Sequence, residues 1–196
     1  DGEYWQFPQA TSCPKPVQDE VPFWVAARAP ITFEYAIEND CNIMSWPLTH
    51  PMSEVVEYRG RLDAAAAAVG RPFGGTWALM RHAAVYDTEE DRQASLAAVR
   101  YVLSLFGNLM MEQGDVVNGF PEPIPLEAMD GNWRVDPEML EENLMFGTPD
   151  QVVAKLKAYE ELGIDSFIYY ASMGLGIENQ RRSFELFIDR VMPEFA

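Results

Sequence analysis

The residues best suited to binding chemistry lie where an apolar run ends and a helix begins. Residues 23–27 form the run, and Arg28, Ala29, Pro30 and Thr32 follow it closely. Pro30 suits the first position of a helix, and Thr32 places a hydroxyl in its first turn. The free N–H groups of a helix start bind phosphate, and Arg28 adds a cation. The segment is a candidate anion site, with an ordinary capped turn and a solvated arginine as the alternative.

Two histidines are candidates for proton transfer. His50 follows the second apolar run, residues 41–46, and lies at the end of a strand, where catalytic groups gather in alternating α/β proteins. It could relay a proton to a substrate carbonyl, or it could be a solvated loop side chain. His82 lies inside a long apolar stretch and is more typical of a satisfied core histidine. His50 is therefore the candidate catalytic residue.

The elements that position these residues alternate between strands and helices. Apolar runs predict strands at 23–27, 41–46, 76–86 and 164–170. Helices are predicted at 31–38, from an N-cap at Ser53 to Gly70, from 87–91 onward, after the capping box of Thr148 and Gln151, and from about 178 to 191. Residues 115–135, rich in proline and glycine, predict an irregular insertion. Four βα units with an insertion before the last indicate the carboxyl-terminal half of a (β/α)₈ barrel, which usually has about 250 residues.

Composition limits the classes of protein to consider. The 196 residues fit one partial barrel domain over 1–196, with 115–135 as its insertion. A formal charge of −17, from 14 basic and 31 acidic residues, argues against nucleic acid and acidic membrane surfaces as partners. The two cysteines, Cys13 and Cys41, lack metal-ligand spacing, so we propose no metal site and expect a reducing, cytoplasmic setting.

The chain reads as part of a longer polypeptide. It begins with Asp1 rather than Met, and four βα units would leave open sheet edges and an uncovered interior. We therefore expect it to form a homodimer or to pair with a missing amino-terminal half. The isolated fragment is expected to be inactive.

Several segments, in their order and spacing, resemble the luciferase-like flavin-dependent monooxygenase family over almost the whole chain. These are Pro14-Lys15-Pro16-Val17-Gln18, the run 23–27, Gly147-Thr148-Pro149, Arg182–Phe187 and Val191-Met192-Pro193. The resemblance implies that Arg28, Ala29 and Thr32 hold the flavin phosphate and that Trp46 lines the flavin ring.

The same resemblance implies the activity. The whole enzyme would use reduced FMN, supplied by a flavin reductase, and dioxygen to oxygenate a small apolar organic substrate. A deazaflavin cofactor with hydride transfer is the alternative within the same fold. A half barrel that binds flavin without catalysis is the alternative from another class.

Overall fold

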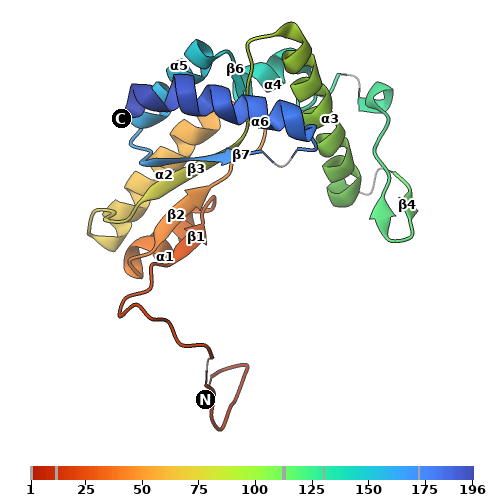
Figure 1. Ribbon diagram of the computed structural model, residues 1–196. Helices are drawn as coiled ribbons and strands as arrows, with labels where there is room; N and C mark the ends of the chain where they lie inside the picture. The colour runs from red at the N-terminus through yellow and green to blue at the C-terminus, as the bar shows by residue number, and fades with distance from the viewer. Residues whose placement is uncertain (1, 12, 112–113, 130, 172) are drawn as a thin grey trace.

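A parallel sheet forms the centre of the computed structural model, which describes residues 2–11, 13–111, 114–129, 131–171 and 173–196 (Figure 1). Residue 130 of the predicted insertion therefore lies outside the described residues. The strands run in the spatial order β1 (Trp24–Ala26), β2 (Asn42–Ser45), β3 (Trp77–Val85) and β7 (Ser166–Tyr170). A further short strand, β6 (Met145–Gly147), pairs with residues 83–85 at the carboxyl end of β3.

Helices follow the strands as the sequence predicts. They are α1 (Pro30–Glu38), α2 (Met52–Val69), α3 (Glu89–Met111), α4 (Pro137–Asn143), α5 (Pro149–Glu161) and α6 (Ile177–Leu186), which continues as a π-helical segment at Phe187–Val191 and a 3₁₀ turn at Met192–Phe195. Strand side chains alternate between the two faces of the sheet. On one face Val25, Ile43, Leu79 and Phe167 pack against buried residues of α1, α2 and α5 and form the main core. The chain is thus an open α/β half barrel with its helices on the outside.

The opposite face of the sheet is only partly covered. Trp24, Met44, Met80 and Ile168 lie on it, since Ala26 is paired with Met44 and Met80 with Ile168. Trp24 is 49% exposed, and the other three are half-buried. In a closed barrel this face is the filled interior. The predicted carboxyl-terminal half of a (β/α)₈ barrel is confirmed.

Four local predictions differ from the structure. The predicted N-cap of α2 at Ser53 is wrong. Pro51 is the N-cap, with extended backbone (ψ 174°), and the helix begins at Met52, so Ser53 already lies inside it. Strand β6 was not predicted, and the last α-helix ends at Leu186 rather than at Val191. The insertion holds a hairpin of β4 (Val116–Val117) and β5 (Phe120–Pro121) and a 3₁₀ turn at Leu126–Met129. Asn118 and Gly119 both have positive φ, which is the geometry of a tight hairpin turn.

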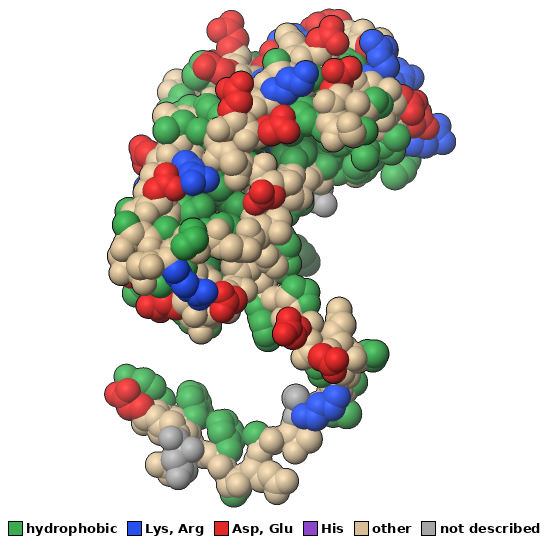
Figure 2. Space-filling view, turned by 90° about the vertical axis from the view of Figure 1, so that its left-hand side faces the viewer, with side chains coloured by type: hydrophobic (Ala, Val, Ile, Leu, Met, Phe, Trp, Pro, Cys, Tyr) green, Lys and Arg blue, Asp and Glu red, His purple; other side chains and the backbone are tan. Residues whose placement is uncertain are grey.

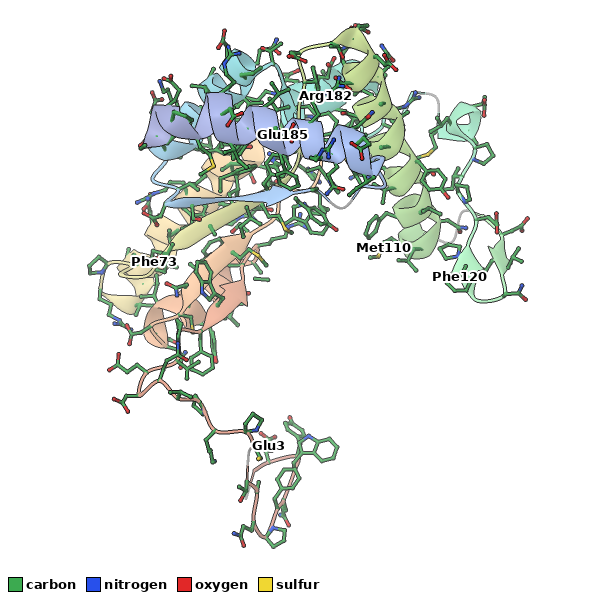
Figure 3. All side chains as sticks on the ribbon, viewed as in Figure 1. Glu3, Phe73, Met110, Phe120, Arg182 and Glu185 are labelled. Atoms are coloured by element: carbon green, nitrogen blue, oxygen red, sulfur yellow. The ribbon has the colours of Figure 1, made fainter. Side chains whose placement is uncertain are left out.

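One buried side chain fastens the hairpin to helix α3. The Asn108 amide donates hydrogen bonds to the carbonyls of Asp115 and Glu122, both at 2.8 Å, and accepts one from the Gly114 N–H at 2.9 Å. Helix α3 projects past the other helices and carries this hairpin at the right of Figure 1. Met110 on the helix and Phe120 on the hairpin lie at the same end of the molecule (Figure 3).

Removing this anchor is expected to loosen the hairpin alone. In Asn108→Ala three hydrogen bonds are lost, each contributing about 1 kcal/mol, so protease cleavage between residues 114 and 122 should be at least about tenfold faster. Ser104→Ala, one turn earlier, is the matched control, because its hydroxyl donates to the Tyr101 carbonyl of the same helix and not to the hairpin, as far as the described residues show. Equal cleavage of both variants would contradict the anchor.

The surface shows the acidic excess of the chain. Acidic side chains outnumber basic ones on the face in Figure 2, and the amino-terminal residues trail away from the body. Tyr4 and Trp5 in that segment are 83% and 75% exposed. Among the described residues no helix combines the length and apolarity needed to span a bilayer.

Candidate functional site

The carboxyl ends of the parallel strands meet at one end of the sheet, which we call the mouth. The connections that open there are residues 27–29 after β1, 46–51 after β2, 86–88 after β3, 148 after β6 and 171–176 after β7, of which residue 172 lies outside the described residues. Ligands of parallel α/β folds bind at this end of the strands. The predicted site residues Arg28, Ala29, Trp46 and His50 all lie on these connections, and Thr32 follows in the first turn of α1.

The start of α1 has the form expected of an anion site. Ala29 is the N-cap with extended backbone (φ −81°, ψ 146°), Pro30 opens the helix, and no side chain caps it. Thr32 is half-buried, and its N–H donates to the Ala29 carbonyl at 3.0 Å. The predicted helix start is confirmed, whereas its ligand stays a prediction.

The Arg28 side chain reaches toward α2. Its Nε donates to the Tyr58 hydroxyl at 2.9 Å, its Nη2 lies 3.5 Å from a Glu54 carboxylate oxygen, and its backbone carbonyl accepts from Arg61 at 2.7 Å. Arg28 therefore joins the β1–α1 connection to α2. About half of its side chain remains exposed, so the cation is still available at the mouth.

His50 lies between charged groups in the β2–α2 connection. Its ring is 5.5 Å from Trp133 of the insertion, edge to face. Burial lowers the pKa of His50, the nearby Glu54 carboxylate opposes this, and the guanidinium groups of Arg134, Arg28 and Arg81 lower the pKa further. A neutral imidazole can accept a proton, which is the property required of a general base near neutral pH.

An aromatic cluster lines the mouth on the partly covered face of the sheet. His82 and Tyr170 are paired in register and stack with ring centroids 4.5 Å apart. Trp46 meets Tyr170 edge-on at 5.5 Å and His82 at 6.1 Å. We call Trp46, His82 and Tyr170 the aromatic platform.

His82 differs from the predicted satisfied core histidine. It is buried at 2% exposure, but its Nδ1 has no hydrogen-bond partner in the described part of the chain, because the strand surroundings are aromatic and apolar. Burial lowers its pKa to about 4. Trp46 Nε1 is likewise buried without a partner among the described residues. Both are orphaned polar atoms at the mouth.

Arg81 holds the β2–α2 connection through hydrogen bonds to its backbone. Sequence analysis did not select this residue. Its Nη1 donates to the carbonyls of Leu48 and His50 at 2.8 and 2.7 Å, and its Nε donates to the Tyr159 hydroxyl of α5 at 3.1 Å. It is fully buried. The available signal was an arginine inside an otherwise apolar strand, since fully buried arginine is rare.

Comparisons with known proteins agree with this geometry. The sequence model for the family described as luciferase-like monooxygenase matches residues 1–166. The oxygenase component of a flavin-dependent trigonelline monooxygenase from Acinetobacter baylyi is 33% identical over 200 residues, covering 100% of this chain and 55% of that protein.

Solved structures share the fold at lower identity. Monooxygenase RslO1 from Streptomyces bottropensis has a TM-score of 0.70 at 21% identity, covering 100% of this chain and 55% of that one. An F420-dependent secondary alcohol dehydrogenase has a TM-score of 0.66 at 18% sequence identity, and the match covers 100% of this chain and 55% of that one. The oxygenating constituent of 3,6-diketocamphane monooxygenase from Pseudomonas putida, in complex with FMN, has a TM-score of 0.60 at 16% sequence identity. The match covers 99% of this chain and 57% of that one.

The described residues form an open parallel α/β half barrel whose connections meet at the carboxyl ends of its strands. The chain belongs to the luciferase-like monooxygenase family. It spans about half the length of the curated relative that it matches.

Proposed function

We propose that this half barrel, completed by a second half, is the oxygenase of a flavin-dependent monooxygenase. Reduced FMN and dioxygen would be used on a small organic substrate that presents an apolar surface to the mouth. The observation that carries the proposal is the family membership of the chain, together with a relative that is a monooxygenase oxygenase component. An oxygenase component implies a separate reductase, so we expect a flavin reductase as partner.

The residues at the mouth fit a flavin nucleotide. The start of α1 has no side-chain cap, so a phosphate placed there would meet the positive end of the helix, the Thr32 hydroxyl and the Arg28 cation, although Pro30 lacks an N–H and the Thr32 N–H already donates to Ala29. The orphaned Nε1 of Trp46 and the aromatic platform suit a flat, polar-edged ring. When bound, reduced flavin supplies the electrons that activate dioxygen.

The protein contributes positioning and proton transfer. Arg81 holds the carbonyls of Leu48 and His50, so the loop that carries the His50 imidazole is fixed at the mouth. A neutral His50 would accept a proton from the substrate or return one to a leaving oxygen. The platform excludes water from one side of the site. The two free cysteines, Cys13 and Cys41, support the proposal of a cytoplasmic protein.

Flavin binding tests the proposal. In the complete polypeptide, Arg28→Ala with Thr32→Ala is expected to weaken reduced FMN binding about tenfold to a hundredfold, because charge-assisted hydrogen bonds to phosphate are lost. Anaerobic titration followed by flavin absorbance measures this. Arg190→Ala on the exposed π-helical segment after α6 is the matched loss of charge and should bind normally. Unchanged FMN affinity in the double variant would remove these residues from the site.

A deazaflavin-dependent hydride transfer is the second candidate, and the F420-dependent structural neighbour favours considering it. Dioxygen distinguishes the two reactions. The monooxygenase must consume dioxygen in proportion to product, whereas hydride transfer proceeds without it. Tight binding of deazaflavin with no dioxygen uptake would establish the second candidate.

A further inference from the structure

Two buried polar atoms of the aromatic platform have no hydrogen-bond partner in the described part of the chain. They are Nδ1 of His82, on β3, and Nε1 of Trp46, directly after β2. The two rings are neighbours, with centroids 6.1 Å apart, and both meet the ring of Tyr170. A buried polar group that lacks a hydrogen bond is costly in free energy, so these two atoms mark a place where a binding partner is expected.

The imidazole ring of His82 is held in one orientation. It stacks on Tyr170 with ring centroids 4.5 Å apart and planes inclined by 23°, and Trp46 meets it at 70°, close to edge-on. Residues 82 and 170 are paired in register on β3 and β7, so the sheet itself fixes the stack. At 2% exposure the His82 side chain has no room to turn toward water. The position of Nδ1 is therefore set before a ligand arrives.

The two atoms differ in the hydrogen bonds that they can make. An indole N–H is a donor only, whereas a neutral imidazole has one donor and one acceptor nitrogen. Burial lowers the pKa of His82 to about 4, so its imidazole is neutral at pH 7. Trp46 therefore requires an acceptor such as a carbonyl oxygen, while Nδ1 of His82 can bind an N–H or a second carbonyl. A flat ring with carbonyl and N–H groups side by side along one edge satisfies both atoms.

The other histidine is placed differently. His50 lies in the β2–α2 connection rather than on a strand, and its ring contacts Trp133 of the insertion, at 5.5 Å. Within the described ranges no ring contact joins His50 to the aromatic platform. Of the two histidines, His82 is thus the one that shares a surface with Trp46.

We propose that Nδ1 of His82 and Nε1 of Trp46 hydrogen-bond the flavin ring along the edge that carries its two carbonyls and the N–H between them. This inference rests on the proposed function for the identity of the ligand. It goes further by giving His82 a binding role and by stating which edge of the ring meets the platform. The opposite edge of a flavin carries two methyl groups, which offer neither atom a hydrogen bond.

Lumiflavin and FMN separate contacts with the ring from contacts with the phosphate, because lumiflavin has the same ring without the ribityl phosphate. Each is titrated into the complete polypeptide, and binding is followed by quenching of the flavin fluorescence. His82→Leu is expected to weaken both ligands about tenfold, since the ring contact is common to them. Arg28→Ala with Thr32→Ala should weaken FMN alone.

His82→Asn tests the hydrogen bond itself. The asparagine amide places a polar atom at the same branch point of the side chain as Nδ1, so this variant should bind lumiflavin within about threefold of the parent. It should also retain the shift in visible absorbance of the bound ring, which His82→Leu should lose. Trp46→Phe keeps an aromatic ring and removes the N–H, so it should weaken lumiflavin about tenfold even if His82→Leu does not fold.

Met80→Leu is the matched control. Met80 lies on the same face of β3, two residues before His82, and has no N–H or oxygen to lose, so the variant should bind lumiflavin normally. Equal lumiflavin affinity in the parent and in His82→Leu, or His82→Asn binding as weakly as His82→Leu, would overturn this inference and leave the flavin-dependent function intact. A parent that binds neither FMN nor lumiflavin would instead refute the proposed function, and this inference with it.

Discussion

Acidification from pH 6.5 to about pH 4 is expected to lower the free energy of unfolding by about 3 kcal/mol through His82 alone. Burial holds the pKa of His82 in the folded protein at about 4, against an ordinary value of 6.5. Below pH 6.5 the unfolded chain therefore gains a proton that the folded chain does not, and unfolding becomes more favourable. Above pH 6.5 the imidazole is neutral in both states and the full stability remains. His82→Leu should remove this part of the pH dependence.

Urea unfolding at several pH values between 7 and 4 measures this effect. Carboxylates also titrate in this range. The effect of His82 is therefore the difference between variant and parent in how steeply the free energy of unfolding falls with pH. The chain has two histidines, and His50→Leu is the matched control. On acidification the His50→Leu variant should still lose most of the free energy of unfolding that the parent loses, because His50 is less buried than His82. A His82→Leu variant that loses stability as steeply as the parent would show that His82 is protonated in the fold.

Lys155→Met is expected to destabilise the protein by at least about 3 kcal/mol at pH 7. The Lys155 ammonium donates to the carbonyls of Leu144 and Phe146, both at 2.8 Å, and also to that of Glu141. It thus joins α5 to the end of α4 and to β6. Burial lowers the pKa of Lys155 to about 8, so the group is still largely charged at pH 7. Methionine matches its length but leaves three carbonyls without their donor.

A second lysine of the same helix provides the comparison. Lys157 is exposed and lies 3.8 Å from Glu194, a surface ion pair of small value. Lys157→Met should change the free energy of unfolding, measured by chemical denaturation, by no more than about 0.5 kcal/mol. Similar losses in both variants would mean that the buried hydrogen bonds of Lys155 contribute little.

Most of the fold was predictable because its signals are local. Thr148 and Gln151 form the predicted capping box, and Gly70 ends α2 with φ 80°, as a left-handed glycine should. Strand β6 was missed because three buried residues directly before a helix start have no period of their own. The Asn118-Gly119 turn was readable, but the surrounding prolines favoured an irregular loop.

Candidate site residues could be predicted only where they lie in a loop next to a predicted strand. Arg28 and His50 were selected because each follows an apolar run, whereas Trp46, the last residue of its run, was selected from the family resemblance. Tyr170 was not, since its contact with His82 depends on the register of β3 and β7, which the sequence does not state. The role of Arg81 likewise depends on a loop 31 to 33 residues away in the chain.

The Asn108 anchor has an evolutionary consequence. Asn108 fixes the hairpin at one end of the insertion, and Asp136 caps α4 at the other by accepting hydrogen bonds from the N–H groups of Glu138 and Met139. Between these two points the length and sequence of the chain can change at little entropic cost, since loop closure depends only weakly on length. Trp133 and Arg134, which lie between these two points, can therefore be substituted without any change to the strands. In this way the insertion can vary while the sheet keeps its strands and register.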